Sequence, residues 1–90
     1  MALGPMQFDD GNNIAVNEEI TDFNNATESG FYHANAGASN SPSPTSYVNC
    51  IVIKGAVITT QIATVGNTTI YMRRKYQGSW TAWNKVTLSA

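Results

Sequence analysis

Cysteine, charge and long apolar runs are all scarce in this 90-residue chain. Its one cysteine, Cys50, excludes an internal disulfide, and its one histidine leaves no Cys/His spacing that suits zinc. No apolar run approaches the ~20 residues of a membrane-spanning helix, and no segment has the pattern of a signal peptide. A domain of this size buries only about 60–65% of its unfolded surface and needs a further source of stability. Oligomerisation is the source that is left.

Charged residues make up 12% of the chain, about half of the usual ~25%. Together with 42% hydrophobic residues, this low charge argues against a disordered chain and against a long helix. It fits a mainly β protein with a surface of Thr, Asn and Ser. The net charge of −1 gives no field that attracts nucleic acid. We therefore expect neither nucleic-acid binding nor insertion into a membrane.

The charges are separated by sign along the chain. Every acidic residue lies before residue 29, and every basic residue lies after residue 53. The simplest interpretation is that an acidic N-terminal segment docks against a basic C-terminal sheet, in the same chain or in a neighbouring one. The acidic residues are Asp9, Asp10, Glu18, Glu19, Asp22 and Glu28, and the basic residues are Lys54, Arg73, Arg74, Lys75 and Lys85.

Four segments in the second half of the chain are rich in β-branched and aromatic residues, which predicts strands over 47–54, 57–65, 68–76 and 80–88. Tight turns join them at Lys54-Gly55-Ala56, Gly66-Asn67 and Gln77-Gly78. We therefore expect a mainly β fold, a small antiparallel meander closed as a sandwich or a barrel-like knob.

The first half of the chain is predicted to be less regular. Residues 14–20 and 30–34 are expected to be short strands. A short helical turn, capped by Thr21 or Asp22, fits between them. Residues 35–46 are rich in Gly, Ser, Asn and Pro and form a predicted loop.

Catalysis is not expected. Glycosidases need two positioned carboxylates, whereas the acidic residues here cluster in the first third of the chain. His33 has no nucleophile with a recognisable motif, so we expect no catalytic residue and no cofactor. The turn DDGNN, residues 9–13, carries oxygen ligands that suit calcium but lacks the rest of a calcium-binding loop, so a solvated turn is favoured over a metal site. Cys50 shares an apolar stripe with Val48 and Val52, which indicates a small buried hydrophobe.

The two tryptophans lie three residues apart, near the end of the chain. In a regular strand, side chains alternate between faces, so Trp80 and Trp83 are predicted to point in opposite directions. Trp80 shares its stripe with Ala82 and Val86, and we expect it in the subunit core. Trp83 is expected on the outer face, among Thr81, Lys85 and Thr87. Arg73 is predicted to stack on one of the two indoles or to hydrogen-bond near it.

Four segments together resemble the knob domain of R-type pyocin and bacteriophage tail fibres: DFNNATESGFYHA, NSPSPTS, TQIAT and TIYMRRKYQGSWTAWNKV. The resemblance covers about residues 20–88. It is carried by Asp22–Tyr32, Pro42 or Pro44, Gln61, Tyr71, Arg73, Trp80 and Trp83. The sequence departs from the family in one place, where Ser-Pro-Ser-Pro replaces a single proline near a glycine.

The resemblance implies a homotrimeric receptor-binding domain at or near the tip of a virion tail fibre. Its implied partner is a glycan of the bacterial surface, such as lipopolysaccharide. The alternative is a structural trimerisation or spacer module, with recognition carried elsewhere in the fibre. A first Met, a Gly-Pro and a second methionine, Met6, indicate that residues 1–7 are an added leader. On the resemblance, residues 8–19 join the fibre shaft and 20–90 form the knob.

The resemblance and the aromatic pattern also divide the candidate residues into two roles. Arg73 and Trp80 are expected to be structural. The candidate glycan contacts are Tyr32, His33, Asn40, Tyr76, Gln77 and Trp83.

Overall fold

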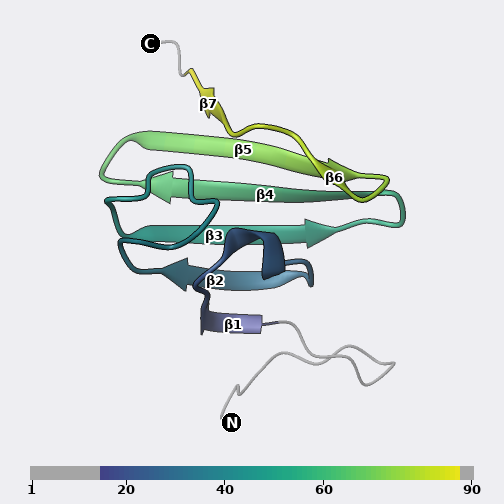
Figure 1. Ribbon diagram of the computed structural model, residues 1–90, viewed down its shortest axis with the longest axis horizontal. Coiled ribbons are helices and arrows are strands. Elements are labelled where there is room, and N and C mark those ends of the chain that lie inside the picture. Colours follow the sequence, from purple (N-terminus) through teal and green to yellow (C-terminus); the bar gives the residue numbers. More distant parts are fainter. Residues whose placement is uncertain (1–14, 88–90) are drawn as a thin grey trace, which may run out of the picture.

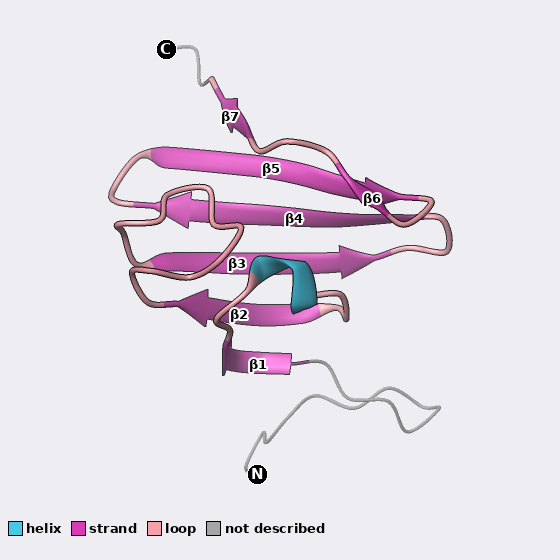
Figure 2. Cartoon of the chain, in the orientation of Figure 1, coloured by secondary structure: helices cyan, strands magenta, loops and turns pink. Residues whose placement is uncertain are grey.

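The computed structural model describes residues 15–87 and is mainly β, with a single 3-10 turn in that range (Figure 1). Figure 2 shows the same elements by type. This confirms the predicted fold class. In chain order the elements are β1 (Ala15–Glu19), η1 (Phe23–Asn25), β2 (Gly30–Ala34), β3 (Val48–Lys54), β4 (Ile58–Val65), β5 (Thr69–Tyr76), β6 (Ser79–Trp80) and β7 (Asn84–Val86).

The strands form one mixed sheet. Strands β2, β3, β4 and β5 lie in chain order, each antiparallel to the next, which confirms the predicted meander. β1 adds a parallel edge beside β2, while β6 and β7 both pair with β5 at the other edge. Over residues 15–87 the strands make a single open layer rather than two packed sheets or a closed barrel.

The turn between β5 and β6 forms where the dipeptide Gln77-Gly78 predicts it. Both residues have positive φ, 50° at Gln77 and 81° at Gly78. A two-residue hairpin needs this conformation at both central positions, because its twist then matches that of the strands. Glycine adopts it without strain, whereas a residue such as Gln77 pays about 1–2 kcal/mol for it.

A single 3-10 turn, η1, forms where the sequence predicts a short helical turn capped by Thr21 or Asp22. Asp22 is its cap, because one carboxylate oxygen accepts a hydrogen bond from the backbone N–H of Asn24 at 2.9 Å. The turn is fixed to the loop that follows β2, since the backbone N–H of Phe23 donates to the carbonyl of Ser39 at 3.0 Å.

One face of the sheet is covered by η1 and by the loop of residues 35–47, which cross in front of β2, β3 and β4 in Figure 1. The hydrophobic core lies beneath them and consists of Phe23, Ala26, Tyr32, Ala34, Ala38, Val48, Cys50, Val52 and Ala63. The prediction of a buried, unreactive Cys50 agrees with this position, because burial raises the pKa of its thiol to about 12. We call this side of the sheet the covered face.

The sequence predicts one continuous strand over 80–88, and this prediction is wrong, because two short strands, β6 and β7, form instead. β6 ends at Trp80, and the chain pairs with β5 again only at Asn84. The hydroxyl of Thr81 accepts a hydrogen bond from the backbone N–H of Arg74 at 3.0 Å. The backbone N–H of Thr81 still donates to the carbonyl of Arg74 at 2.8 Å, so the hydroxyl replaces only the returning bond of this pair, and the chain leaves the ladder after Thr81.

None of the helical structure in residues 15–87 has the length and apolar composition needed to cross a membrane.

Candidate functional site

The side of the sheet opposite η1 is apolar and solvent-exposed. Its central row crosses four strands through Phe31, Ile51, Ile62 and Met72, which are successive partners in the β2–β3–β4–β5 register. Phe31 is 45% exposed, Ile51 is 44% exposed and Ile53 is 53% exposed. We call this surface the open face, and it comprises Phe31, Ile51, Ile53, Ile58, Ile62, Met72 and Tyr76.

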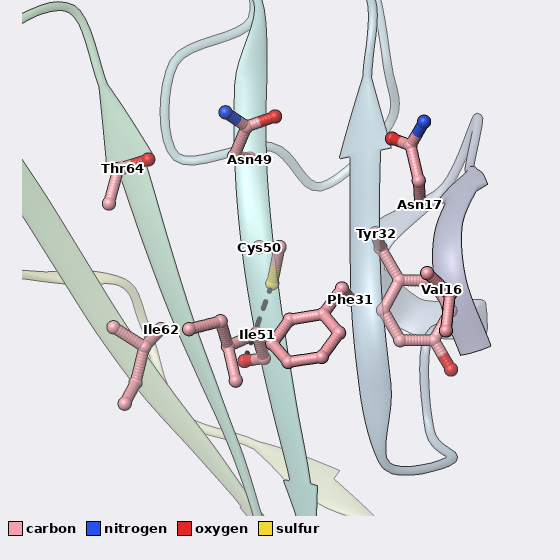
Figure 3. Close-up of a pocket in the computed structure, with 9 residues that line it drawn as sticks. All are labelled: Val16, Asn17, Phe31, Tyr32, Asn49, Cys50, Ile51, Ile62 and Thr64. Atoms are coloured by element: carbon pink, nitrogen blue, oxygen red, sulfur yellow. Dashed lines mark hydrogen bonds between the residues drawn. The ribbon is translucent and has the colours of Figure 1, made fainter. Parts of the chain in front are cut away.

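A groove of about 390 Å³ runs along the open face between β1 and β4 (Figure 3). Figure 3 shows the ring of Phe31 beside Ile51, with Ile62 on the next strand. Asparagine and threonine side chains lie at one end of the groove. Its lining residues are Val16, Asn17, Phe31, Tyr32, Asn49, Cys50, Ile51, Ile62 and Thr64.

The open face is large for a domain of this size. Strands about 4.8 Å apart, with about 3.3 Å per residue, give the four central strands a face of about 19 by 25 Å, or about 500 Å². The largest apolar patch on a typical monomer is about 300–600 Å² and is often functional. Thr60, Thr64 and Arg74 share this face, so its apolar part is smaller than the whole area. The face as a whole has the dimensions of the centre of a protein–protein interface.

On the covered face, Arg73 lies between the two indole rings. Its guanidinium carbon is 4.1 Å from the ring centroid of Trp80 and 4.7 Å from that of Trp83. The side chain is only 5% exposed, and burial lowers the pKa of the guanidinium. The group stays protonated at neutral pH because an arginine begins from so high a pKa. Each indole therefore faces a cation that has little contact with water.

Gln61 connects this cation to η1. Arg73 Nε donates to Gln61 Oε1 at 2.7 Å, and Gln61 Nε2 donates to the carbonyls of Phe23 at 2.7 Å and Ala26 at 2.9 Å. Arg73 Nη2 donates to Asn24 Oδ1 at 2.9 Å. Gln61 is fully buried, at 0% exposure. These bonds fasten η1 onto β4 and β5, and they satisfy both ends of the buried amide.

The expectation that Trp80 and Trp83 point to opposite faces is wrong. Both rings are half-buried, and both lie against Arg73. Trp83 also packs edge-on against Phe23 of the core, with ring centroids 5.8 Å apart and an interplanar angle of 87°. The alternation argument fails because residues 81–83 are not part of a strand.

Asn40 and Trp83, two of the candidate glycan contacts, meet at one corner of the covered face. Trp83 Nε1 donates to the carbonyl of Asn40 at 2.8 Å, and Asn40 Nδ2 donates to Asp22 Oδ1 at 2.8 Å. The bond from Asn40, and then the one from the backbone of Asn24, lower the pKa of the Asp22 carboxyl. The polar groups of this corner are therefore engaged with one another inside the subunit.

Tyr32 and His33, two further candidates, are neighbours in β2 and project to opposite faces. Tyr32 is buried, burial raises its pKa, and its hydroxyl donates to the carbonyl of Glu28 at 2.6 Å. His33 is half-buried, and its Nε2 lies 3.7 Å from a carboxylate oxygen of Glu19. Its Nδ1 is buried and has no hydrogen-bond partner among residues 15–87. Little of Tyr32 is therefore accessible to a ligand.

Tyr76 and Gln77, the remaining candidates, lie where β5 turns into β6. The ring of Tyr76 is 50% exposed, and Gln77 is exposed in the turn. Gln77 also borders a second groove, of about 440 Å³. We call it the lysine groove, and its lining residues are Thr27, Glu28, Lys54, Gly55, Ala56, Val57, Thr59, Lys75, Gln77 and Gly78.

An ion pair joins the acidic and the basic parts of the chain at the lysine groove. Lys54 Nζ lies 2.9 Å from Glu28 Oε2. This contact agrees with the predicted docking of an acidic segment against the basic sheet, within one chain. In the described part of the sequence, no cluster of His, Cys, Asp and Glu has the composition of a metal site. The candidate calcium turn at 9–13 and the leader at 1–7 lie outside the described residues.

Two features went unrecognised in the sequence: the part of Asn24 in binding Arg73, and the open face. A signal for the open face is present in β3, whose sequence VNCIVIK is apolar on both stripes. Val48, Cys50 and Val52 face the core, while Ile51 and Ile53 face solvent.

A family model described as the XkdV N-terminal domain matches residues 7–86, nearly the whole chain. No curated protein and no solved structure matches the sequence. The matched family is phage-associated, in agreement with the phage origin that the sequence resemblance implies, whereas the relationship to pyocin knobs stays a prediction.

Proposed function

The chain belongs to the XkdV N-terminal domain family, and we propose that it is a tail-fibre module that assembles with copies of itself through the open face. The family indicates a phage tail-related structural protein, with a structural rather than a catalytic role. Self-assembly is the finer function that the geometry supports best.

The apolar row of the open face carries this proposal. A sheet with a hydrophobic face is stable when that face is buried against another layer. Residues 15–87 supply such a layer to the covered face, through η1 and the loop 35–47, and supply none to the open face. Burial of apolar surface is favourable by about 25 cal/mol per Å², and this gain opposes the roughly 4–15 kcal/mol cost of association.

A second copy of this chain is the occupant that the face favours. Its central row, Phe31 to Met72, contains no charged residue, so two such rows can meet without placing like charges together. Arg74 lies in one adjacent row, opposite Thr60, and His33 lies in the other, opposite Asn49. The resemblance to tail-fibre knobs makes three the expected number of copies, with three open faces enclosing a common axis.

Sedimentation velocity at micromolar concentration tests this assembly. The wild-type chain should sediment at three times its single-chain mass of 9.7 kDa. Ile51→Glu should sediment as a single chain and stay folded, because Ile51 is 44% exposed within one subunit and the new charge meets water there. A folded wild-type monomer would overturn the proposal.

Thr45→Glu is the matched control for this experiment. Thr45 is an exposed residue of the loop on the covered face, so the same charge is added away from the open face. It should assemble like the wild type. If Ile51→Glu also assembles like the wild type, the subunits meet through another surface.

Binding of a host-surface glycan is the second candidate function. It is favoured by the exposed ring of Tyr76 beside the exposed amide of Gln77, since an aromatic face with a nearby amide suits a sugar ring. Tyr76 pairs with Ile58 in the end row of the open face, away from the central row that carries the proposed contact, so this ring is expected to lie at the rim of the assembly. A glycan array probed with the assembled protein tests this function. Binding that Tyr76→Ala removes, without loss of assembly, supports it, and an array without any bound glycan contradicts it.

A further inference from the structure

We propose that the lysine groove binds the anionic group of an acidic polysaccharide, a carboxylate or a phosphate, between Lys54 and Lys75. The inference rests on the second candidate function, glycan binding, and names the class of glycan. It does not depend on self-assembly through the open face, because the lysine groove lies at the end of the covered face.

The register of the sheet places the two lysines on either side of a hydroxyl. Lys54 of β3 is the partner of Thr59 in β4, and Thr59 is the partner of Lys75 in β5. Residues in one such row project from the same face. Two strand spacings put the backbones of the lysines about 10 Å apart, and their flexible side chains are long enough to converge on one group above Thr59.

The groove above this row has the dimensions and the polar groups of a small ligand site. Its volume of about 440 Å³ is within the range of small-molecule sites, about 300–1,000 Å³. Gln77, Thr27 and Thr59, whose side chains carry an amide and two hydroxyls, are among its lining residues. Amides and hydroxyls both donate and accept hydrogen bonds, as sugar hydroxyls require. The lining therefore offers cations for an acidic group and neutral partners for the ring that carries it.

The groove has an excess of positive charge. Glu28 lies 2.9 Å from Lys54 and partly neutralises it. Lys75 Nζ lies 5.7 Å from the ring centroid of Trp80, and no carboxylate of the described chain is within ion-pair distance of it. One carboxylate thus faces two ammonium groups, and an incoming anion supplies the missing negative charge.

Calorimetric titration of the assembled protein tests the inference with three polymers. Polygalacturonate carries carboxylates, poly(glycerol phosphate) carries phosphates, and dextran is an uncharged control. We expect binding of at least one acidic polymer at low salt, weakened by added salt as for any exposed ionic contact, and no binding of dextran. The acidic polymer that binds more tightly identifies the anionic group.

Three single substitutions separate the groove from general charge effects. Lys75→Gln should weaken binding about tenfold, as for loss of one hydrogen bond to a charged group. Glu28→Gln should strengthen binding severalfold, because it releases Lys54 to the ligand, and a merely structural role of Glu28 does not predict a gain. Lys85→Gln removes the same charge from β7, outside the groove, and should bind like the wild type.

Four results would overturn the inference. They are no binding of either acidic polymer at low salt, equal binding of dextran, equal loss in Lys85→Gln and Lys75→Gln, or dissociation of the assembly by Lys75→Gln. Equal binding of dextran would contradict the preference for an acidic glycan but would still support glycan binding as a function. Dissociation would show that the groove holds an acidic side chain of a neighbouring copy.

Discussion

Replacing Arg73 by alanine removes the central group of the covered face. The change deletes the hydrogen bonds from the guanidinium to Gln61 and Asn24 and its contacts with the rings of Trp80 and Trp83. It also leaves Gln61 Oε1 without its donor, at a residue that is fully buried. The variant should therefore fold less stably than the wild type.

The magnitude of this loss follows from the contacts. An unsatisfied buried acceptor costs about 1–3 kcal/mol, and each contact of a cation with an indole contributes about 0.5–2 kcal/mol. Together they indicate a loss of about 3–5 kcal/mol, since neighbouring terms do not add fully. A domain of this length has about 5–13 kcal/mol of total stability, so Arg73→Ala should lose roughly a quarter or more of it.

Urea unfolding, followed by tryptophan fluorescence and by far-UV circular dichroism at one fixed protein concentration, measures the loss. Arg74→Ala is the matched control, because Arg74 is exposed and adjacent in sequence, and exposed substitutions usually change stability by less than about 0.5 kcal/mol. Equal unfolding midpoints for Arg73→Ala and Arg74→Ala would refute the assignment of Arg73 as structural.

Two further predictions concern titratable groups. The Asp22 carboxyl has a folded pKa below its ordinary 3.8, so its stabilisation is present above pH 3.8 and is lost as the pH falls through the folded pKa. Asn40→Gly removes the side-chain bond to Asp22, and glycine adopts the positive φ of residue 40 without strain. The substitution should raise the pKa of Asp22 towards 3.8, which NMR titration measures. It should also reduce the difference in urea midpoint between neutral and acidic pH. The Cys50 thiol, with its pKa raised to about 12, should resist iodoacetamide in the folded protein at mildly alkaline pH and react in urea, which intact mass measures; rapid modification of the folded protein would contradict its burial.

The strands and turns were predictable because their signals are local. Alternation within 47–54 and 68–76, and the dipeptides Gly66-Asn67 and Gln77-Gly78, depend only on neighbouring residues. The structure places strands at nearly the same positions, Val48–Lys54 and Thr69–Tyr76. The parallel pairing of β1 with β2 was not predictable in this way, because it joins two segments across the 3-10 turn.

The Arg73 network could be predicted only in part, because its contacts are distant in sequence. Arg73 reaches Asn24 across 49 residues, and this pairing depends on where η1 packs against the sheet. The stacking of arginine on an indole was expected, but the break after Trp80 was not. At that break Thr81 bonds to Arg74 with its backbone N–H and its side-chain hydroxyl, and no alternation pattern reveals such a mixed pair.

The open face could have been recognised in the sequence of β3, but its state of burial could not. Apolar residues on both stripes of a strand are typical of strands that are covered on both faces. The sequence does not specify whether the second cover is another part of the same chain or another copy. The structure narrows this choice, because residues 15–87 cover one face only.

The two faces of the sheet differ in how they stabilise the protein. The covered face buries Phe23, Tyr32, Val48 and Val52 among smaller residues, with Trp83 packed against them and the Arg73–Gln61 network beside them. Several of the larger aliphatic and aromatic side chains, Phe31 and Ile51 among them, lie on the open face. In the proposed assembly, burial of these side chains would add hydrophobic stabilisation that the single subunit lacks, and folding would then be coupled to subunit concentration. It follows that Arg73→Ala weakens the subunit and the assembly together, whereas Ile51→Glu weakens the assembly and leaves the subunit with the network that folds it.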